Sequence, residues 1–140
     1  MRPLVLVMVF LSLLLALEAS AVLTPQVIDT KFSTDDVVIA SLVVQPPADR
    51  HDNAGPMLQA AIDQVATEGG GVIFLPAGIY HIATPLLVKE RVILRGDWAP
   101  PGKAKPGETT VLAITANRGE VDGPAALATE FGSGVREVTV

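Results

Sequence analysis

The chain has no cysteine and few aromatic residues. None of its 140 residues is Cys, and Phe, Trp and Tyr together make up 4%. Without cysteine the fold carries no disulfides, which small exported domains commonly use to compensate for a thin core, and a lipid-modified cysteine is excluded. The chain must therefore bury its aliphatic side chains by regular stacking, or belong to something larger.

Basic clusters are also missing. Lys and Arg number 10 against 15 Asp and Glu, which gives a formal net charge of −5, and the basic residues are scattered. Nucleic-acid binding needs a clustered positive surface, so nucleic acid is excluded as a partner. The glycines at 69–71 are not followed by the Gly-Lys-Ser/Thr of a phosphate loop. Their role is therefore in backbone geometry.

A single long apolar run is present, at the N-terminus. It extends from Leu4 to Leu17, is interrupted only by Ser12, follows Arg2 and precedes Ala19-Ser20-Ala21. This order is typical of a secretory signal peptide with cleavage after Ala21. The run is shorter than the roughly 20 residues of a membrane-spanning helix. We predict a signal peptide over residues 1–21, a secreted or periplasmic location, and no stable membrane insertion after its removal.

An amphipathic helix is predicted just before the triple glycine. Its apolar stripe recurs at i, i+3, i+4 and i+7 and consists of Leu58, Ala61, Ile62 and Val65. Asp52 or Asn53 can cap the first turn with a side-chain oxygen, and Pro56 is tolerated in that turn. Gly69 is placed to end the helix in the left-handed conformation.

Short β-rich segments surround this helix. They are predicted at residues 36–44, 72–75, 79–82, 86–88, 91–95, 109–115 and 135–140. The links at 76–78, 83–85 and 89–90 lack the Asn-Gly or Asp-Gly pair of the favoured two-residue hairpin. A chain that turns corners rather than reversing uses links of this kind, which favours a β-solenoid whose rungs share one core. Residues 22–35 are predicted to be an irregular lead, 98–108 and 117–124 loops, and 125–131 a helical turn.

The helix and the strands after it resemble a known family. Residues 52–65 (DNAGPMLQAAIDQV), 69–80 (GGGVIFLPAGIY), 85–88 (PLLV) and 92–96 (VILRG) resemble the opening of the pectate lyase superfamily domain, in its rhamnogalacturonase/epimerase-like branch. Thr110-Val111-Leu112 stands where the next rung would place its strand. The family's glycine-rich acidic turn before the helix is replaced here by residues 47–53 (PADRHDN), which retain acidic residues but no glycine.

The resemblance implies a mainly β protein with a right-handed parallel β-helix of the pectin lyase type and an N-terminal capping helix. We predict three regions: a signal peptide (1–21), a lead-in with one strand (22–50), and the cap helix with the first rungs (51–140). The strand pattern at 135–140 continues to the last residue and no closing cap follows. We therefore expect this to be the opening, incomplete part of a longer β-helix.

The implied function is a secreted pectin- or uronate-type lyase or hydrolase whose catalytic residues lie beyond this stretch, with polysaccharide as substrate or ligand. Two alternatives stay open. One is a non-catalytic structural or carbohydrate-binding β-helix at a cell or particle surface. The other is a compact α/β domain without a solenoid, in which the strand at 37–44 is a sheet partner.

No catalytic, metal or cofactor residue is assigned from the sequence, and the substrate-binding residues are unknown. Calcium needs six to eight converging oxygen ligands, and the one adjacent acidic pair, Asp35-Asp36, would point to opposite faces of a strand. An inverting hydrolase needs two carboxyls about 6.5–9.5 Å apart. Asp97 and Asp122 lie in predicted loops, and nothing in the sequence brings them together.

The remaining polar candidates have ordinary structural explanations. His51 and His81 are the two histidines, and a lone strand histidine is more often satisfied by neighbours than part of a site. Arg91 and Arg95 are four apart and would share one strand face, where pairing with Glu90 and Asp97 is favoured over contact with an anionic sugar. Trp98, the one tryptophan, either stacks on a sugar ring or covers the end of a rung.

Overall fold

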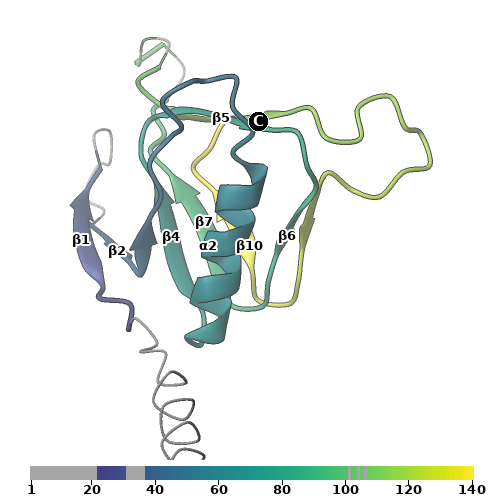
Figure 1. The fold of residues 1–140 in the computed structure, drawn as a ribbon. Helices are drawn as coiled ribbons and strands as arrows, with labels where there is room; N and C mark the ends of the chain where they lie inside the picture. The colour runs from purple at the N-terminus through teal and green to yellow at the C-terminus, as the bar shows by residue number, and fades with distance from the viewer. Residues whose placement is uncertain (1–21, 31–36, 101, 104, 106) are drawn as a thin grey trace, which may run out of the picture.

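The computed structural model describes residues 22–30, 37–100, 102–103, 105 and 107–140. The predicted signal peptide at 1–21 and the Asp35-Asp36 pair lie outside these residues. The described part is mainly β, with one helix among short strands (Figure 1). In chain order the elements are β1 (Gln26–Asp29), β2 (Val37–Ala40), β3 (Leu42–Val43), α2 (Gly55–Thr67), β4 (Gly71–Leu75), β5 (Gly78–Ile82), β6 (Leu86–Val88), β7 (Val92–Gly96), β8 (Thr110–Ile114), β9 (Leu127–Thr129) and β10 (Gly134–Arg136).

Strands after the helix pair in parallel with strands three elements away. β4 pairs with β7 and β7 with β10, while β5 pairs with β8 and β6 with β9. Consecutive strands β4, β5 and β6 thus lie in three different sheets, and β7, β8 and β9 return to the same sheets in the same order. The prediction that the short links turn corners instead of forming hairpins is confirmed for these strands. The sheets are small and do not close on one another.

The pairing register places similar side chains next to each other on neighbouring strands. Ile82 lies beside Ile114 and Leu86 beside Leu127, and the row formed by Ile73, Leu94 and Val135 crosses three strands. Alternate residues of each strand face inward, since side chains on a strand alternate between its two faces. These inward residues form one continuous, mainly aliphatic cluster, the main core.

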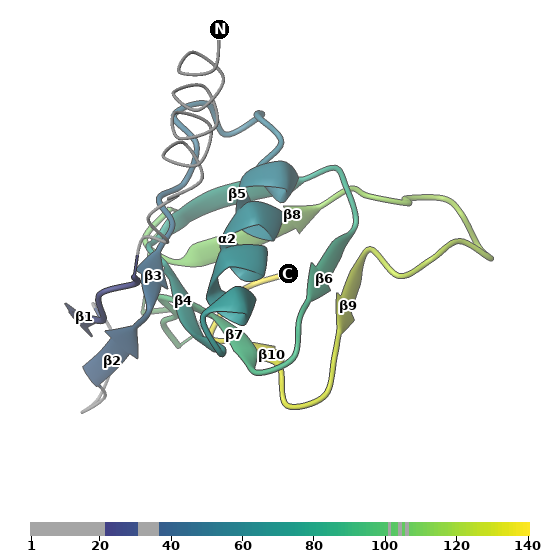
Figure 2. The ribbon, with the colours of Figure 1, turned by 60° about the horizontal axis from the view of Figure 1, so that its bottom comes forward.

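Helix α2 lies across one end of this strand stack (Figures 1 and 2) and packs against β4, β5, β6 and β7. Its predicted stripe is confirmed as the buried face: Leu58, Ala61, Ile62 and Val65. Pro56 stands in the first turn. The helix ends before Gly69, which has φ +100°, and Gly70 N donates to Val65 O at 2.9 Å. The left-handed conformation of Gly69 is as predicted, and Gly69 N also donates to Ala66 O at 3.1 Å, so two carbonyls of the last turn are satisfied.

The N-terminal cap differs in detail from the prediction. The N-cap residue is Ala54, which makes no side-chain cap bond. Asn53 acts from one position earlier, because its Oδ1 accepts from Gly55 N at 3.0 Å and from Ala83 N at 2.9 Å. The carboxamide therefore joins the start of the helix to the end of β5.

Several predicted boundaries were wrong. The strand expected over 36–44 is two strands, β2 and β3, separated at Ser41, and the expected irregular lead contains β1. Residues 125–131, expected as a helical turn, contain β9, because Leu127 stacks in register on Leu86. The last strand is limited to β10, since Glu137 has φ +56° and turns the chain toward a bridge between Thr139 and Val111.

The lead-in packs against the outside of the stack. β1 and β2 form an antiparallel ribbon, and β3 pairs in parallel with β4. Val38 and Ala40 of the ribbon are buried against Phe74 in a second, smaller apolar cluster. α2 has 13 residues. Among the described residues, no helix has the length and hydropathy needed to span a bilayer.

Candidate functional site

The outer face of the β10-β7-β4-β3 sheet is divided into a covered half and an uncovered half. The register places two rows of side chains on this face: Val72, Ile93 and Gly134 in one, and Val43, Phe74, Arg95 and Arg136 in the other. The β1–β2 ribbon covers the row members on β3 and β4. The members on β7 and β10 lie beyond the ribbon, so this half of the face is the candidate contact surface.

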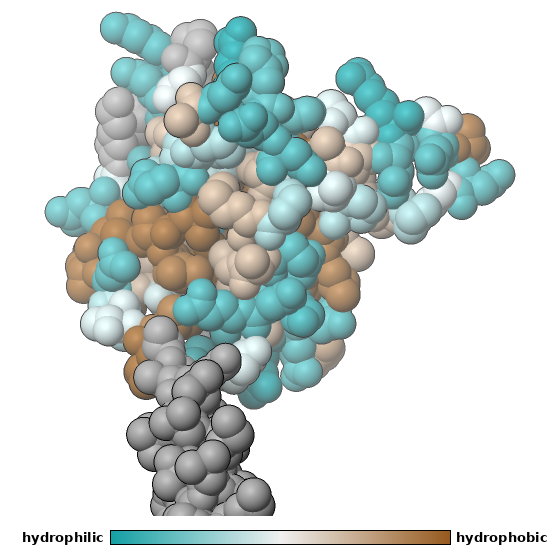
Figure 3. Space-filling model, viewed as in Figure 1, coloured by the Kyte–Doolittle hydropathy of each residue, from teal (hydrophilic) through white to brown (hydrophobic). Residues whose placement is uncertain are grey.

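The ribbon itself presents an apolar outer side. Val27 and Ile39 are opposite each other in the ladder and are 71% and 63% exposed. The space-filling view shows apolar surface gathered over the ribbon at its left (Figure 3). This side carries no described ionisable group apart from Asp29, opposite Val37.

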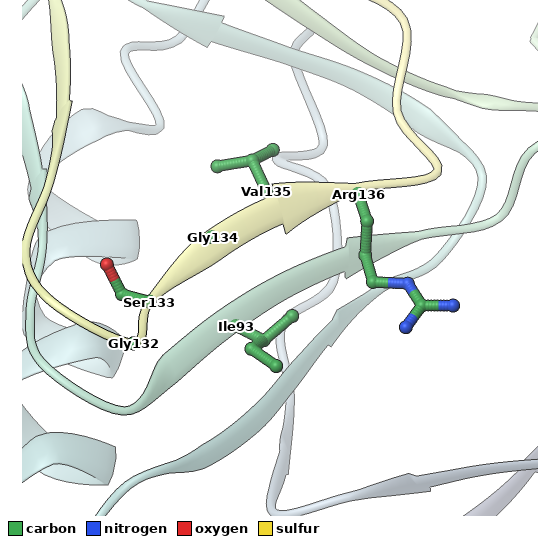
Figure 4. Close-up of a pocket in the computed structure, with 6 residues that line it drawn as sticks. All are labelled: Ile93, Gly132, Ser133, Gly134, Val135 and Arg136. Atoms are coloured by element: carbon green, nitrogen blue, oxygen red, sulfur yellow. The ribbon is translucent and has the colours of Figure 1, made fainter.

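A shallow hollow lies on the uncovered half. Its volume is about 130 Å³, and it is lined by Ile93, Gly132, Ser133, Gly134, Val135 and Arg136. Figure 4 shows the side chains of Ile93 and Arg136 on the same side of the sheet, with Val135 on the other. Gly134 leaves the backbone of β10 uncovered above Ile93, its partner in the register. The hollow therefore has an apolar floor with a guanidinium at one end.

Two arginines share one carboxylate beside this hollow. Arg95 Nε donates to Glu137 Oε2 at 2.7 Å, and Arg136 Nη2 donates to Glu137 Oε1 at 3.0 Å. The side chain of Arg95 is 9% exposed and that of Arg136 is 54% exposed. Arg95 is thus held within the protein, while the side chain of Arg136 is more than half exposed and contacts Glu137 through Nη2. The group carries a net charge of about +1 in an acidic chain.

Arg91 and Arg95 do not share a strand face. Arg91 precedes β7 with φ +62° and forms an exposed ion pair with Glu90 at 3.8 Å. The predicted pairing of Arg91 with Glu90 is confirmed, and Arg95 also forms an ion pair with Glu137, 42 residues away. Because Glu137 turns in from beyond β10, no local spacing signals this pair.

Both histidines are part of the structure around Asn53. His81 Nε2 is 2.8 Å from Thr115 Oγ1, and His81 Nδ1 is 3.2 Å from His51 O. His51 Nε2 accepts from Arg50 Nε at 3.3 Å on the surface. His81 thereby connects the chain before α2 to the end of β8. This geometry supports the structural explanation given for His81 from the sequence.

The predicted carboxylate candidates fall in different surroundings. Asp97 is 8% exposed, and its backbone N donates to Thr110 Oγ1 at 2.8 Å. Asp122 is exposed in the loop between β8 and β9. Trp98 is 43% exposed next to Asp97. Among the described residues, no three His, Asp or Glu side chains converge on a point that could hold a metal ion.

The residues of the hollow were not predicted as a site. Arg136 lies in the strand expected over 135–140, but Gly134 precedes the expected start of that strand, so the prediction did not place the two residues on one face. The position of Ile93 beneath Gly134 depends on the register between β7 and β10. Nothing in the sequence indicates that Glu137, after the strand, would return to Arg95.

Comparisons with known proteins identify the family. No curated protein and no solved structure matches the chain. The family described as rhamnogalacturonase A/epimerase, pectate lyase-like, matches residues 47–137. The match begins before α2 and ends after β10, so it includes the helix, strands β4 to β10 and the hollow. The chain therefore belongs to the rhamnogalacturonase A/epimerase, pectate lyase-like family, as the resemblance of residues 52–96 predicted.

Proposed function

We propose that this chain is an exported, right-handed parallel β-helix protein that acts on or binds polysaccharide of the pectin or uronate type. The observation that carries the proposal is the parallel row β4-β7-β10, which lies within the family match. The family is polysaccharide-related, and its repeated strand stack presents long side-chain rows suited to an extended chain of sugars.

A general rule supports a right-handed coil. β4 and β7 are parallel neighbours, and the connection between them passes through β5 and β6. Such crossover connections are right-handed in roughly 98% of cases, because strand twist favours that path. A right-handed circuit of three sheets is the arrangement that the family resemblance implies.

Lyase and hydrolase chemistry make different products, which allows a direct test. The full chain is incubated with polygalacturonate, rhamnogalacturonan and a neutral galactan, with and without added Ca²⁺. A lyase generates unsaturated ends that absorb in the ultraviolet, and a hydrolase generates reducing ends without that absorbance. We expect the acidic polymers to be bound or cleaved in preference to the galactan.

Three results would decide among the functions. Turnover of an acidic polymer supports an enzyme, and binding without turnover supports polysaccharide recognition by this stretch of the chain. Neither binding nor turnover on any polymer would count against the polysaccharide proposal as a whole.

Export is tested separately. The apolar run and Ala19-Ser20-Ala21 support cleavage after Ala21. Expression with the natural N-terminus and sequencing of the secreted or periplasmic product should give a chain that begins at Val22. Retention of Met1 on a cell-associated product would contradict this part of the proposal.

A further inference from the structure

The hollow on β7 and β10 has the composition of a small ligand site. Ligand pockets are generally apolar with a few placed polar groups that fix orientation. Here the floor is Ile93, the strand backbone at Gly134 is bare, and the guanidinium of Arg136 stands at the end. The volume of about 130 Å³ is suited to one ring rather than to a large ligand.

Gly134 leaves room above the strand. A Cβ placed on this residue would meet no heavy atom within 4 Å, and its φ is not in the left-handed region. The backbone at this position therefore does not require glycine. A larger side chain at 134 would project into open space over Ile93, which provides a way to fill the hollow without disturbing the core.

Arg136 supplies the charge. Its contact with Glu137 uses Nη2, and the side chain is 54% exposed. A guanidinium has five N–H donors in a planar fork, which matches a carboxylate or a similar oxyanion. Glu137 is held from its other side by the buried Arg95 at 2.7 Å, so Arg136 is oriented by an anchored carboxylate and retains donors for a ligand.

We propose that this hollow binds a single sugar unit that carries an anionic group, either a carboxylate or a sulfate ester. The apolar face of the ring lies on Ile93 and the bare backbone of Gly134, and the oxyanion accepts hydrogen bonds from Arg136. This inference rests on the proposed function and extends it, since it assigns the contact to named residues and requires a charged unit.

Titration of the full chain followed by backbone amide NMR tests the inference. The probes are a galacturonate trisaccharide, a sulfated galactose trisaccharide and the neutral galactose trisaccharide. The variants are Gly134→Leu, which fills the hollow, Gly134→Ala, which adds one methyl group, and Arg136→Gln, which removes the charge. Arg118→Gln is the matched control, because Arg118 is an exposed arginine in the loop between β8 and β9.

We expect the amides of 132–136 to shift with an anionic probe and much less with the neutral one. Loss of a charge-assisted hydrogen bond should weaken binding about tenfold or more in Arg136→Gln. Gly134→Leu should weaken it similarly, Gly134→Ala less, and Arg118→Gln should leave it within about twofold of the parent, because removal of an isolated surface charge has little effect. Preference for the galacturonate probe identifies a carboxylate, and preference for the sulfated probe identifies a sulfate ester.

The failures are distinguishable. If the parent binds a glycan and neither Gly134→Leu nor Arg136→Gln changes the affinity, the inference is wrong and the proposed function stands. Equal affinity for the neutral probe has the same meaning. If the parent binds no glycan and cleaves none, both are wrong. Unfolding midpoints of the variants, measured alongside, verify that lost binding does not reflect lost folding.

Discussion

The two ends of the strand stack are finished in different ways. At the end covered by α2, the outer edge of each strand of the first circuit is hydrogen-bonded to another part of the chain. β4 pairs with β3. Asn53 forms a parallel bridge with His81 of β5, and Ala54 N donates to His81 O at 2.7 Å. β6 is bonded by Gln59, whose Oε1 accepts from Leu87 N at 2.9 Å and whose Nε2 donates to Leu87 O at 3.2 Å.

At the other end the strands have fewer partners. Thr139 exchanges bonds with β8, at 2.8 Å to Leu112 N and 3.0 Å to Thr110 O. Within the described residues, β9 pairs only with β6 and β10 only with β7. The hydrophobic residues here, such as Leu127 and Val135, are half-buried, whereas those below α2 are fully buried.

A strand edge can be satisfied without a neighbouring strand. Gln59 lies on a helix, yet its carboxamide offers the same donor and acceptor as a peptide group and bonds both backbone groups of Leu87. Unpaired strand edges invite association with other chains. The helix therefore both buries the core and occupies an edge, which the opposite end does not achieve in the described part.

The largest difference between the ends should appear in core substitutions. Leu58→Ala removes a fully buried side chain below α2 and should lower the free energy of unfolding by about 2–5 kcal/mol. The loss is one of packing, since alanine favours helix. The matched change Leu127→Ala, at the half-buried opposite end, should cost clearly less. Urea unfolding of both variants measures this, and equal losses would contradict the proposed asymmetry.

Tyr80 tests the connection between the lead-in and the covered end. Its hydroxyl is fully buried, 2.8 Å from Val44 O and 3.1 Å from Pro76 O. Tyr80→Phe leaves these carbonyls without that donor and should cost about 1–3 kcal/mol. Replacement of Ile79, which is half-buried on the other face of β5, by valine is a suitable control, for which we expect a cost near or below 1 kcal/mol.

The same tyrosine predicts a pH dependence. Burial raises the pKa of the Tyr80 phenol far above its ordinary value of 10.0. Because the folded state favours the neutral phenol, the stability that depends on this phenol is fully present below pH 10. The free energy of unfolding declines as the pH rises above that value. Thermal unfolding between pH 9 and about 11 should show this decline in the parent and a smaller one in Tyr80→Phe. Identical slopes would show that another group is responsible.

A substitution of Gln59 tests whether its side chain stabilises the outer edge of β6. Gln59→Met keeps the length of the side chain and removes the bonds to Leu87, which should cost about 0.5–1.5 kcal/mol. The amide of Leu87 should then exchange with solvent faster. Gln64→Met, on the exposed side of the same helix, is the matched control and should change neither quantity. Unchanged exchange at Leu87 would indicate that α2 covers this edge without bonding it.

The sequence predicted the covered end better than the open one. The stripe of α2 and the strands at 72–75 and 79–82 follow local rules of period and propensity, and the structure confirmed them. Residues 125–131 show no such local pattern. Leu127–Thr129 forms a strand because it pairs in parallel with β6. β1 likewise depends on β2, with which it forms its antiparallel ladder.

The candidate site was less predictable than the fold. Gly134 and Arg136 become neighbours of Ile93 and Arg95 through a register set one circuit away. Glu137 reaches Arg95 only because its backbone turns at φ +56°. Such contacts depend on how far the chain travels between rungs, and the intervening loops of variable length leave no periodic signal for that distance.

The smallest effect should come from the surface ion pair that joins α2 to the end of β6. Lys89 Nζ is 2.9 Å from Asp63 Oδ1, and hydrogen bonds from Lys89 and then Gln59 lower the pKa of the Asp63 carboxyl below its ordinary 3.8. A lowered pKa stabilises the fold above the ordinary value and loses that contribution as the pH falls through the folded one. Because both side chains are more than 40% exposed, solvent and salt screen the pair. NMR titration should show the pKa of Asp63 rising in Lys89→Met and, by less, in Gln59→Met, with little change in overall stability. A larger rise in Gln59→Met than in Lys89→Met would mean that the Gln59 carboxamide, rather than Lys89, is the main cause of the lowered pKa of Asp63.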